Sequence, residues 1–341
     1  MVDRGTVHGI GPLFRSLGIK MDFTAVNSKQ AGSAVPRELF GFEVLCHLGT
    51  GAASEIYAVA DPKSHQIYAL KHVVKGDAKS ERFISQLEAE FEIGRAVIHP
   101  GLRRSIELLM NRTIFRKVTD AALILELFDG QPLETRPTSS LDSTLDCFIQ
   151  VARSLDALNA AGFVHCDLKP NNILRASGGE VKVIDLGQAC KIGQVKARVQ
   201  GTPDYISPEQ VNCGPVTNRT DVFNFGATLY WALTGKNIPT LFRIAKKSNS
   251  FLIDEKIPSP RELNVGVPET LSVVVMECVR TPPSKRPESM GSVARRLEVI
   301  HHHIRHTTNG HPTGGNGRLP APFPDAQQID GRDGDRVCAF A

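Results

Sequence analysis

The sequence is informative first for what it lacks. Its 341 residues include seven cysteines but no C-x-x-C pair, and an odd, dispersed set is atypical of a disulfide framework or a zinc site. No stretch approaches the roughly 18–20 apolar residues that span a bilayer. The N-terminus also lacks the basic-then-apolar pattern of an export signal. We therefore expect a protein with no membrane span in a reducing, cytoplasmic location.

The chain also has only a small excess of positive over negative charge. The chain carries 40 Lys and Arg against 36 Asp and Glu, and its basic residues form no stripe interleaved with aromatics. Composition therefore gives no support for nucleic-acid binding, and an anionic nucleotide ligand would account for the mild basicity equally well. With 41% hydrophobic residues the chain has ordinary globular composition and enough length for two lobes with a real core.

The first half of the chain has the pattern of a β-rich unit. Residues 1–40 show no sustained period and are predicted to be a loosely ordered leader. Short runs of β character, separated by turns, follow at 42–48, 55–60 and 67–72. Apolar residues spaced at three and four predict an amphipathic helix over 80–98. Further strands are expected around 105–110 and 121–127.

The pattern becomes helical near residue 130. After the turn-rich stretch 129–143, apolar residues from Leu145 to Leu158 form one helical face that ends at Gly162. Further helices are expected at 219–234, 268–280 and 289–304. The last residues, 305–341, are rich in Gly and Pro without periodicity and are predicted to be a flexible tail.

The strongest chemical signal is the run His165-Cys166-Asp167-Leu168-Lys169-Pro170-Asn171-Asn172. In it the carboxylate of Asp167 can accept a proton from an attacking hydroxyl, the ammonium of Lys169 can neutralise a moving phosphoryl group, and the amide oxygen of Asn172 can hold magnesium. The run resembles the catalytic loop of eukaryotic-type Ser/Thr protein kinases, with Cys166 where most members carry Arg.

This resemblance implies an α+β, bilobal, protein-kinase-like fold. A kinase domain over 41–304 would consist of a small β-rich N-lobe, 41–128, and a larger helical C-lobe, 129–304. ATP and Mg²⁺ would be its cofactors, and proteins with Ser or Thr acceptors its substrates.

Two further motifs resemble the family's phosphate-binding parts. The run from Leu48 to Ile56 resembles the Gly-rich loop that covers ATP phosphates, with Ser54 in place of the third glycine. Taken alone, this run favours a tight hairpin, and the position of its Gly51, 20 residues before Lys71, supports the resemblance. Tyr68-Ala69-Leu70-Lys71 resembles the third strand, whose lysine binds the α- and β-phosphates and pairs with a helix glutamate. Spacing from His99-Pro100 favours Glu90 as that partner over Glu88 and Glu92.

The same register places Gly94 where the family usually carries a bulky residue of the hydrophobic spine. A glycine inside a helix costs about 0.5–1 kcal/mol relative to alanine. We therefore predict that this helix is more mobile than is usual in the family.

The segment Leu123–Gly130 resembles the last N-lobe strand running into the hinge, although alone it is equally an ordinary buried strand. The resemblance makes Leu125 the residue behind the adenine pocket and implies that backbone groups of Glu126 and Leu127 bind adenine. The ring would lie among Ile56, Ala69 and Leu174. The other predicted nucleotide-binding residues are Leu48, Gly49, Gly51 and Lys71.

Two further motifs and two single residues complete the resemblance. Val181–Gly187 ends in Asp-Leu-Gly, similar to the family's Asp-Phe-Gly, so Asp185 is predicted to bind magnesium together with Asn172. Gly201–Glu209 resembles the peptide-positioning end of the activation segment. Glu209 is expected to form a buried ion pair with Arg286, and Asp221 to hold the catalytic-loop backbone.

The six catalytic groups Lys71, Glu90, Asp167, Lys169, Asn172 and Asp185 occur in family order, which favours an active kinase. The presence of Lys169 two residues after Asp167, and of Thr202 in the peptide-positioning segment, resembles the pattern of Ser/Thr kinases rather than that of Tyr kinases. Because Cys166 replaces the usual Arg and 188–200 contain no Ser, Thr or Tyr, we predict activity independent of phosphorylation in that segment. The alternatives are a nucleotide-binding pseudokinase scaffold and a small-molecule phosphotransferase, and the latter would not be expected to carry Gly201–Glu209.

Overall fold

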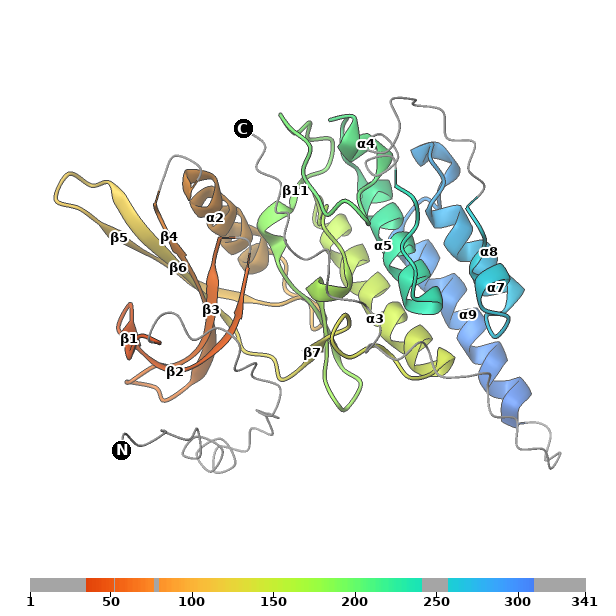
Figure 1. The fold of residues 1–341 in the computed structure, drawn as a ribbon, viewed down its shortest axis with the longest axis horizontal. Coiled ribbons are helices and arrows are strands. Elements are labelled where there is room, and N and C mark those ends of the chain that lie inside the picture. The colour runs from red at the N-terminus through yellow and green to blue at the C-terminus, as the bar shows by residue number, and fades with distance from the viewer. Residues whose placement is uncertain (1–34, 52, 77–79, 241–256, 310–341) are drawn as a thin grey trace, which may run out of the picture. The chain divides into compact units, whose positions relative to one another are not determined.

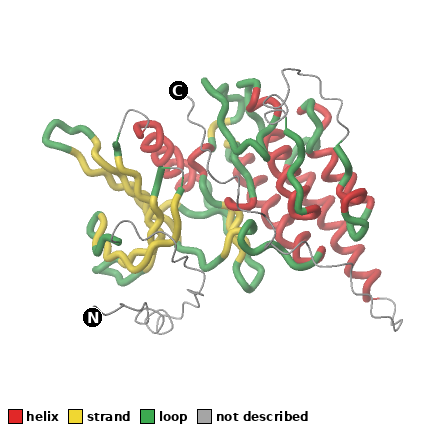
Figure 2. The backbone as a smooth tube through the Cα atoms, viewed as in Figure 1, coloured by secondary structure: helices red, strands yellow, loops and turns green. Residues whose placement is uncertain are grey.

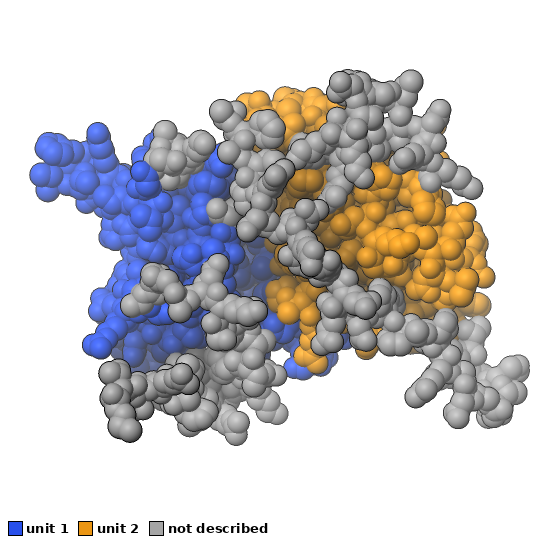
Figure 3. All heavy atoms as spheres, viewed as in Figure 1, with its two compact units in different colours: residues 1–131, 157–165, 174–192 blue, residues 132–156, 166–173, 193–341 orange. Residues whose placement is uncertain are grey.

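The computed structural model describes residues 35–51, 53–76, 80–240 and 257–309 (Figure 1). Most of the predicted leader and tail, and Ala52 of the Gly-rich run, lie outside the described residues. Contacts divide the chain into two compact units: residues up to 131 with 157–165 and 174–192, and the remainder (Figure 3). Strands dominate the first unit and helices the second (Figure 2), so the predicted α+β class is confirmed.

The β-rich unit is built on one antiparallel sheet of six strands. Its order is β1-β2-β3-β4-β6-β5. The helix α2 (Ser80–Ala96) separates β4 from β5 in the chain, and β5 lies at the edge of the sheet, where it pairs with β6. The bounds are β1 Glu38–Leu39, β2 Phe42–Thr50, β3 Glu55–Ala60, β4 Ile67–Val74, β5 Ser105–Arg112 and β6 Val118–Glu126. Every predicted strand is present, and β1 adds a short strand inside the predicted leader.

The sheet buries both faces, which follows from the alternation of side chains along a strand. On one face, Ala69 and Val73 of β4 pack with Ile84 and Leu87 of α2. On the other face Leu70 packs with Tyr57 and its neighbours. Lys71 lies two residues from both Ala69 and Val73, so its side chain belongs to the face that α2 covers.

Gly94 lies where α2 approaches β5 closely. A Cβ added at Gly94 would overlap Oγ of Ser105 and lie 3.1 Å from its Cβ, while that hydroxyl donates to the carbonyl oxygen of Glu90 at 3.1 Å. The structure therefore gives the glycine a packing reason, because only a residue without a side chain lets the helix lie this near the strand. Mobility of the helix stays a prediction.

Several short strands and one 3₁₀ turn complete the β-rich unit. β8 (Phe163–Val164) pairs antiparallel with β11 (Cys190–Lys191). The 3₁₀ turn η3 (Leu186–Gln188) follows β10 and packs against α2. The boundaries between the two units fall within β7, within β9, and at residues 156–157, 165–166 and 192–193. The bounds are β7 Gln131–Pro132, β9 Ile173–Arg175 and β10 Val181–Val183.

The helical unit is centred on α5 (Asn218–Thr234), which is buried along most of its length. Phe225 of α5 meets Phe148 of α3 (Leu141–Ala160) edge to face, with ring centroids 5.5 Å apart. Thr217 caps the start of α5, and Gly235 ends it with a φ of 68°, a left-handed conformation that favours glycine. The predicted helix 219–234 is thus confirmed.

The remaining helices pack around this centre. The two long helices among them, α8 and α9, were predicted at 268–280 and 289–304, but α9 continues past 304 into the predicted tail. Their bounds, with the short helical turns, are α4 Pro208–Val211, α7 Pro260–Leu263, α8 Glu269–Cys278, α9 Met290–Asn309, η2 Pro170–Asn172 and η4 Pro283–Lys285. Within the described ranges, no helix is both long and apolar enough to cross a membrane.

The expected ion pair between Glu209 and Arg286 is present and two-pronged. The Arg286 side chain is fully buried, and its Nη1 and Nη2 donate to the two carboxylate oxygens of Glu209 at 2.8 and 2.9 Å. Thr220 also donates to the carboxylate, at 2.8 Å, while Arg286 donates to the carbonyl oxygens of Arg219, Arg280 and Thr281. The pair ties α4 to α5 and to the η4 turn.

Replacing Arg286 with Ala should lower the free energy of unfolding by about 3–5 kcal/mol, because the charge of Glu209 would remain buried without a partner. Urea-induced unfolding measures this change. The control is Arg153→Ala, which breaks an exposed pair with Glu298 and should cost at most about 1 kcal/mol. Equal losses for the two variants would contradict the structural role of the buried pair.

Gly94→Ala should destabilise the protein, although alanine at an ordinary mid-helix position would stabilise it by about 0.5–1 kcal/mol. The added methyl group must displace Ser105. In a Ser105→Gly background the obstacle is gone, so the same Gly94→Ala change should become stabilising. A double-mutant cycle of unfolding free energies measures this coupling, and additive effects would show that the two residues do not compete for space.

Candidate active site

The β-rich unit brings three predicted catalytic side chains to one point. The ammonium of Lys71 on β4 donates to Glu90 Oε2 at 2.7 Å and to Asp185 Oδ1 at 2.8 Å. Glu90 comes from the middle of α2, and Asp185 follows β10 with a φ of 66°. Of the three glutamates considered, Glu90 is therefore the one that pairs with Lys71, as the spacing predicted.

Burial and charge set the protonation of this cluster. Burial alone would lower the pKa of Lys71, but the carboxylates of Glu90 and Asp185 outweigh it and raise that pKa above its usual range. Burial would likewise raise the pKa of Asp185, but Lys71, with smaller effects of His165 and Arg103, holds it well below the usual range of a carboxyl. At neutral pH the cluster therefore holds a charged ammonium beside an ionised Asp185.

The predicted phosphate loop joins β2 and β3. Leu48 and Gly49 lie near the end of β2, and the N–H of Gly51 donates to the carbonyl oxygen of Ser54 at 2.7 Å. A Cβ at Gly51 would come within 2.6 Å of the Ser54 hydroxyl oxygen. Ser54 thus occupies the space beside Gly51, so a side chain at Gly51 would have to displace the Ser54 hydroxyl.

The three side chains predicted to surround the adenine ring lie on three strands of the same unit. Ile56 on β3 stands opposite Lys71 on β4, and Ala58 opposite Ala69, so Ile56, Ala69 and Lys71 share one face of the sheet. Leu174 lies on β9. The structure thus joins Ile56, Ala69 and Lys71 on one face, while Leu174 comes from a separate strand.

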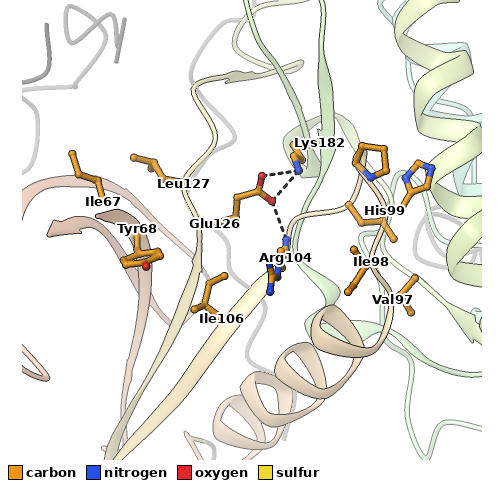
Figure 4. A pocket seen from close by; sticks show the side chains of 12 residues that line it. Ile67, Tyr68, Val97, Ile98, His99, Arg104, Ile106, Glu126, Leu127 and Lys182 are labelled. Carbon is orange, nitrogen blue, oxygen red and sulfur yellow. Dashed lines mark hydrogen bonds and ion pairs between the residues drawn. The ribbon is translucent and has the colours of Figure 1, made fainter. Parts of the chain in front are cut away.

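Glu126 has a role that the resemblance did not imply. Its carboxylate accepts hydrogen bonds from Lys182 Nζ at 2.8 Å and from the Arg104 N–H at 3.2 Å. Its own N–H donates to the Arg104 carbonyl oxygen at 3.0 Å. These contacts border a pocket that Ile106 and Leu127 also line (Figure 4). They anchor the start of the predicted hinge segment to β10 and to the residues before β5.

The helical unit brings together Asp167, Lys169 and Asn172, the three residues predicted from the catalytic-loop resemblance. Asp167 is 6% exposed, and its Oδ1 accepts from the N–H and the hydroxyl of Thr202 at 2.9 and 2.8 Å. Lys169 Nζ donates to Thr202 Oγ1 at 2.9 Å and lies 3.5 Å from Asp167 Oδ2. Pro170 opens the η2 turn that follows, and Asn172 Nδ2 donates back to the Asp167 carbonyl oxygen at 2.8 Å.

The catalytic-loop backbone is held by two buried side chains. Cys166 has a φ of 66°, uncommon for a residue with a side chain, and its N–H donates to Asp221 Oδ1 at 3.0 Å, as predicted. Its carbonyl oxygen accepts from Gln210 Nε2 at 2.6 Å. The thiol itself is fully buried.

Comparison with known proteins identifies this arrangement. A model of the protein kinase domain matches residues 42–302. The chain belongs to the protein kinase family. The kinase domain is 32% identical over 262 residues to the serine/threonine-protein kinase PknA of Mycobacterium tuberculosis, covering 74% of this chain and 59% of PknA. It is 25% identical over 301 residues to the serine/threonine-protein kinase PknD of Chlamydia pneumoniae, covering 77% of this chain and 31% of PknD.

The kinase chain therefore spans less than two thirds of the length of each of these relatives. The match covers both units, from the start of β2 into α9. It includes every predicted catalytic residue.

Protein kinases use ATP, typically with Mg²⁺, and each of the two predicted ligands of this chain has a donor atom that suits that ion. Asp185 offers an ionised carboxylate. Asn172 uses its amide nitrogen to bond Asp167, so its amide oxygen is the atom suited to a metal. Among the described residues no group of three or more His, Cys, Asp or Glu could hold a metal ion alone. Oxygen ligands from one or two side chains plus phosphate are the usual magnesium site.

Sequence reasoning missed two buried residues of this kinase. Gln210 follows the Ser-Pro-Glu motif directly, and Arg103 follows the His-Pro motif by three residues. Both are at least nine-tenths buried, with exposed fractions of 3% and 8%. Arg103 has no readable signal in the sequence, because along residues 103–106 the polar Arg103 and Ser105 are buried and the apolar Ile106 is exposed. Gln210 has none either, because most of its partners lie far away in the sequence.

Proposed function

We propose that this chain is a Ser/Thr protein kinase that transfers the γ-phosphate of ATP to protein hydroxyl groups. The observation that carries the proposal is the set of contacts around Asp167. Thr202 holds one carboxylate oxygen with two hydrogen bonds, which orients the second oxygen toward Lys169. A carboxylate fixed in this way suits a base for an incoming hydroxyl.

Each group has a defined task in this mechanism. Asp167 orients the acceptor hydroxyl and takes its proton, and Lys169 stabilises the negative charge of the phosphoryl group in transfer. Lys71 orients the phosphates, with Glu90 positioning its ammonium. Asn172 and Asp185 would hold the magnesium ion, which when bound neutralises phosphate charge.

The domain and its location are part of the proposal. The kinase domain would comprise an N-lobe over 41–128 and a C-lobe over 129–304, which the family match over 42–302 supports. The six cysteines within the described residues are not joined in disulfides, and a reducing cytoplasm that also holds ATP is the compartment we propose.

The first test measures transfer of labelled γ-phosphate from Mg-ATP to a generic basic protein. Asp167→Asn should lower the rate by about 100-fold or more, because the base is lost, while the exposed Glu134→Gln control should keep the wild-type rate. Transfer to a small molecule alone would favour a small-molecule phosphotransferase. ATP binding without any transfer would identify a pseudokinase scaffold.

We also propose that activity does not depend on phosphorylation of residues 188–200. Gln210 Nε2 donates to the carbonyl oxygens of Cys166 and Gln200 at 2.6 and 3.0 Å. Its Oε1 accepts from the N–H and hydroxyl of Ser207 and from Asn224 Nδ2. One uncharged side chain thus joins the catalytic loop to the end of the activation segment, a task that needs no phosphate.

Kinase prepared with a co-expressed phosphatase, and shown by mass spectrometry to be unphosphorylated, should start turnover without a lag. Gln210→Met should lower kcat by about 10-fold or more, since several buried hydrogen bonds are lost at about 1 kcal/mol each. Gln200→Ala is the matched control, because Gln200 contributes only its backbone oxygen to this contact. Activity that appears only after modification of the segment would contradict the proposal.

A further inference from the structure

Arg103 is a buried cation for which the mechanism above has no use. Along residues 103–106 the side chains alternate, with Arg103 and Ser105 buried and Arg104 and Ile106 exposed. The whole residue Arg103 is only 8% exposed. Arginine is almost never buried to this extent without a partner.

No such partner exists within the described part of the chain. Arg103 Nε is buried and donates no hydrogen bond to a described residue. The guanidinium also forms no ion pair with a described residue. The carboxylates of Glu90, Asp185 and Glu126 attract its charge only across space. A guanidinium carries five N–H donors in a planar fork, so this one has hydrogen-bonding capacity that the protein itself leaves unused.

The backbone explains why Arg103 lies beside the catalytic cluster. Its N–H donates to the Val183 carbonyl oxygen at 3.0 Å, and the Val183 N–H donates to the Gly101 carbonyl oxygen at 2.8 Å. Val183 precedes Asp185 by two residues. Two residues further along, Ser105 bonds the backbone of Glu90. Arg103 is therefore held between the segments that carry the two carboxylates bound to Lys71.

The charges of this cluster suggest what Arg103 does. Lys71 and Arg103 carry two positive charges, and Glu90 and Asp185 carry two negative ones. The ammonium of Lys71 is shared between both carboxylates. Without Arg103 the three remaining groups would carry a net charge of −1, which disfavours binding of a polyphosphate in the absence of a metal ion. With it, the site is neutral and contains a cation that is not engaged in an ion pair.

We propose that Arg103 is a second phosphate-binding cation of the nucleotide site, and that its guanidinium engages the phosphate oxygens of the bound nucleotide. This inference rests on the proposed function. Planar, charge-assisted binding of phosphate is the chemistry for which arginine is best suited. The ligand class is a nucleoside di- or triphosphate, and the effect should be greatest when no metal shares the phosphate charge.

Calorimetric titration of the full chain with ADP and with adenosine, both in EDTA, tests the proposal without any turnover. Arg103→Met should weaken ADP binding by about 10-fold or more and leave adenosine binding unchanged. Arg103→Lys should fall between wild type and Arg103→Met, since the charge remains without the fork. The matched control is Arg104→Met, which removes the same charge from the exposed side chain next to it (Figure 4) and should bind ADP as wild type does.

Methionine in place of a buried, unpaired arginine should not unfold the protein, and unchanged adenosine binding reports an intact site. Unchanged ADP binding in Arg103→Met, equal weakening in Arg104→Met, or a parallel loss of adenosine binding would each overturn this inference alone. A wild-type protein that binds neither ADP nor adenosine would overturn it together with the proposed function.

Discussion

The shared ion contact of Lys71 is the interaction on which the nucleotide half of the site depends. One ammonium bonds two carboxylates at 2.7 and 2.8 Å, and each carboxylate arrives on a different element. The register of β3 and β4, the close approach of α2 to β5 at Gly94, and the end of β10 must all be correct for the three groups to meet. Because each charge would be costly to bury alone, an error in any of these elements separates the cluster.

The helical unit solves a similar problem mainly with hydrogen bonds. Gln210 and Thr202 hold the catalytic loop and the segment after it, and Asp221 adds a bond to the backbone of Cys166. Gln210 and Thr202 contribute amide and hydroxyl groups to these contacts, while Asp167 and Asp221 contribute carboxylates. The Lys71 cluster instead depends on one ammonium placed between two carboxylates.

Periodicity along the chain predicted the long elements well. The helices α2 and α5 and the strands β2 to β6 appear close to their expected positions, because each has enough residues for its pattern to repeat. The two-residue strand β1 has no readable pattern, since it forms only by pairing with β2. The continuation of α9 to Asn309 also escaped prediction. Arg305, at its start, bonds Asp142 of α3, as does His301 one turn earlier, a contact that local sequence does not reveal.

The site divides in the same way. The sequence alone determined the chemical groups and their order: Lys71, Glu90, Asp167, Lys169, Asn172 and Asp185 were identified by type and spacing within short motifs. Tertiary structure decided which partners those groups have. It gave Lys71 two carboxylates, Gln210 the task of joining two loops, and Arg103 a buried place without an ion pair. Motifs are local along the chain, whereas these contacts join residues up to 114 positions apart, and only packing of the folded chain brings such residues together.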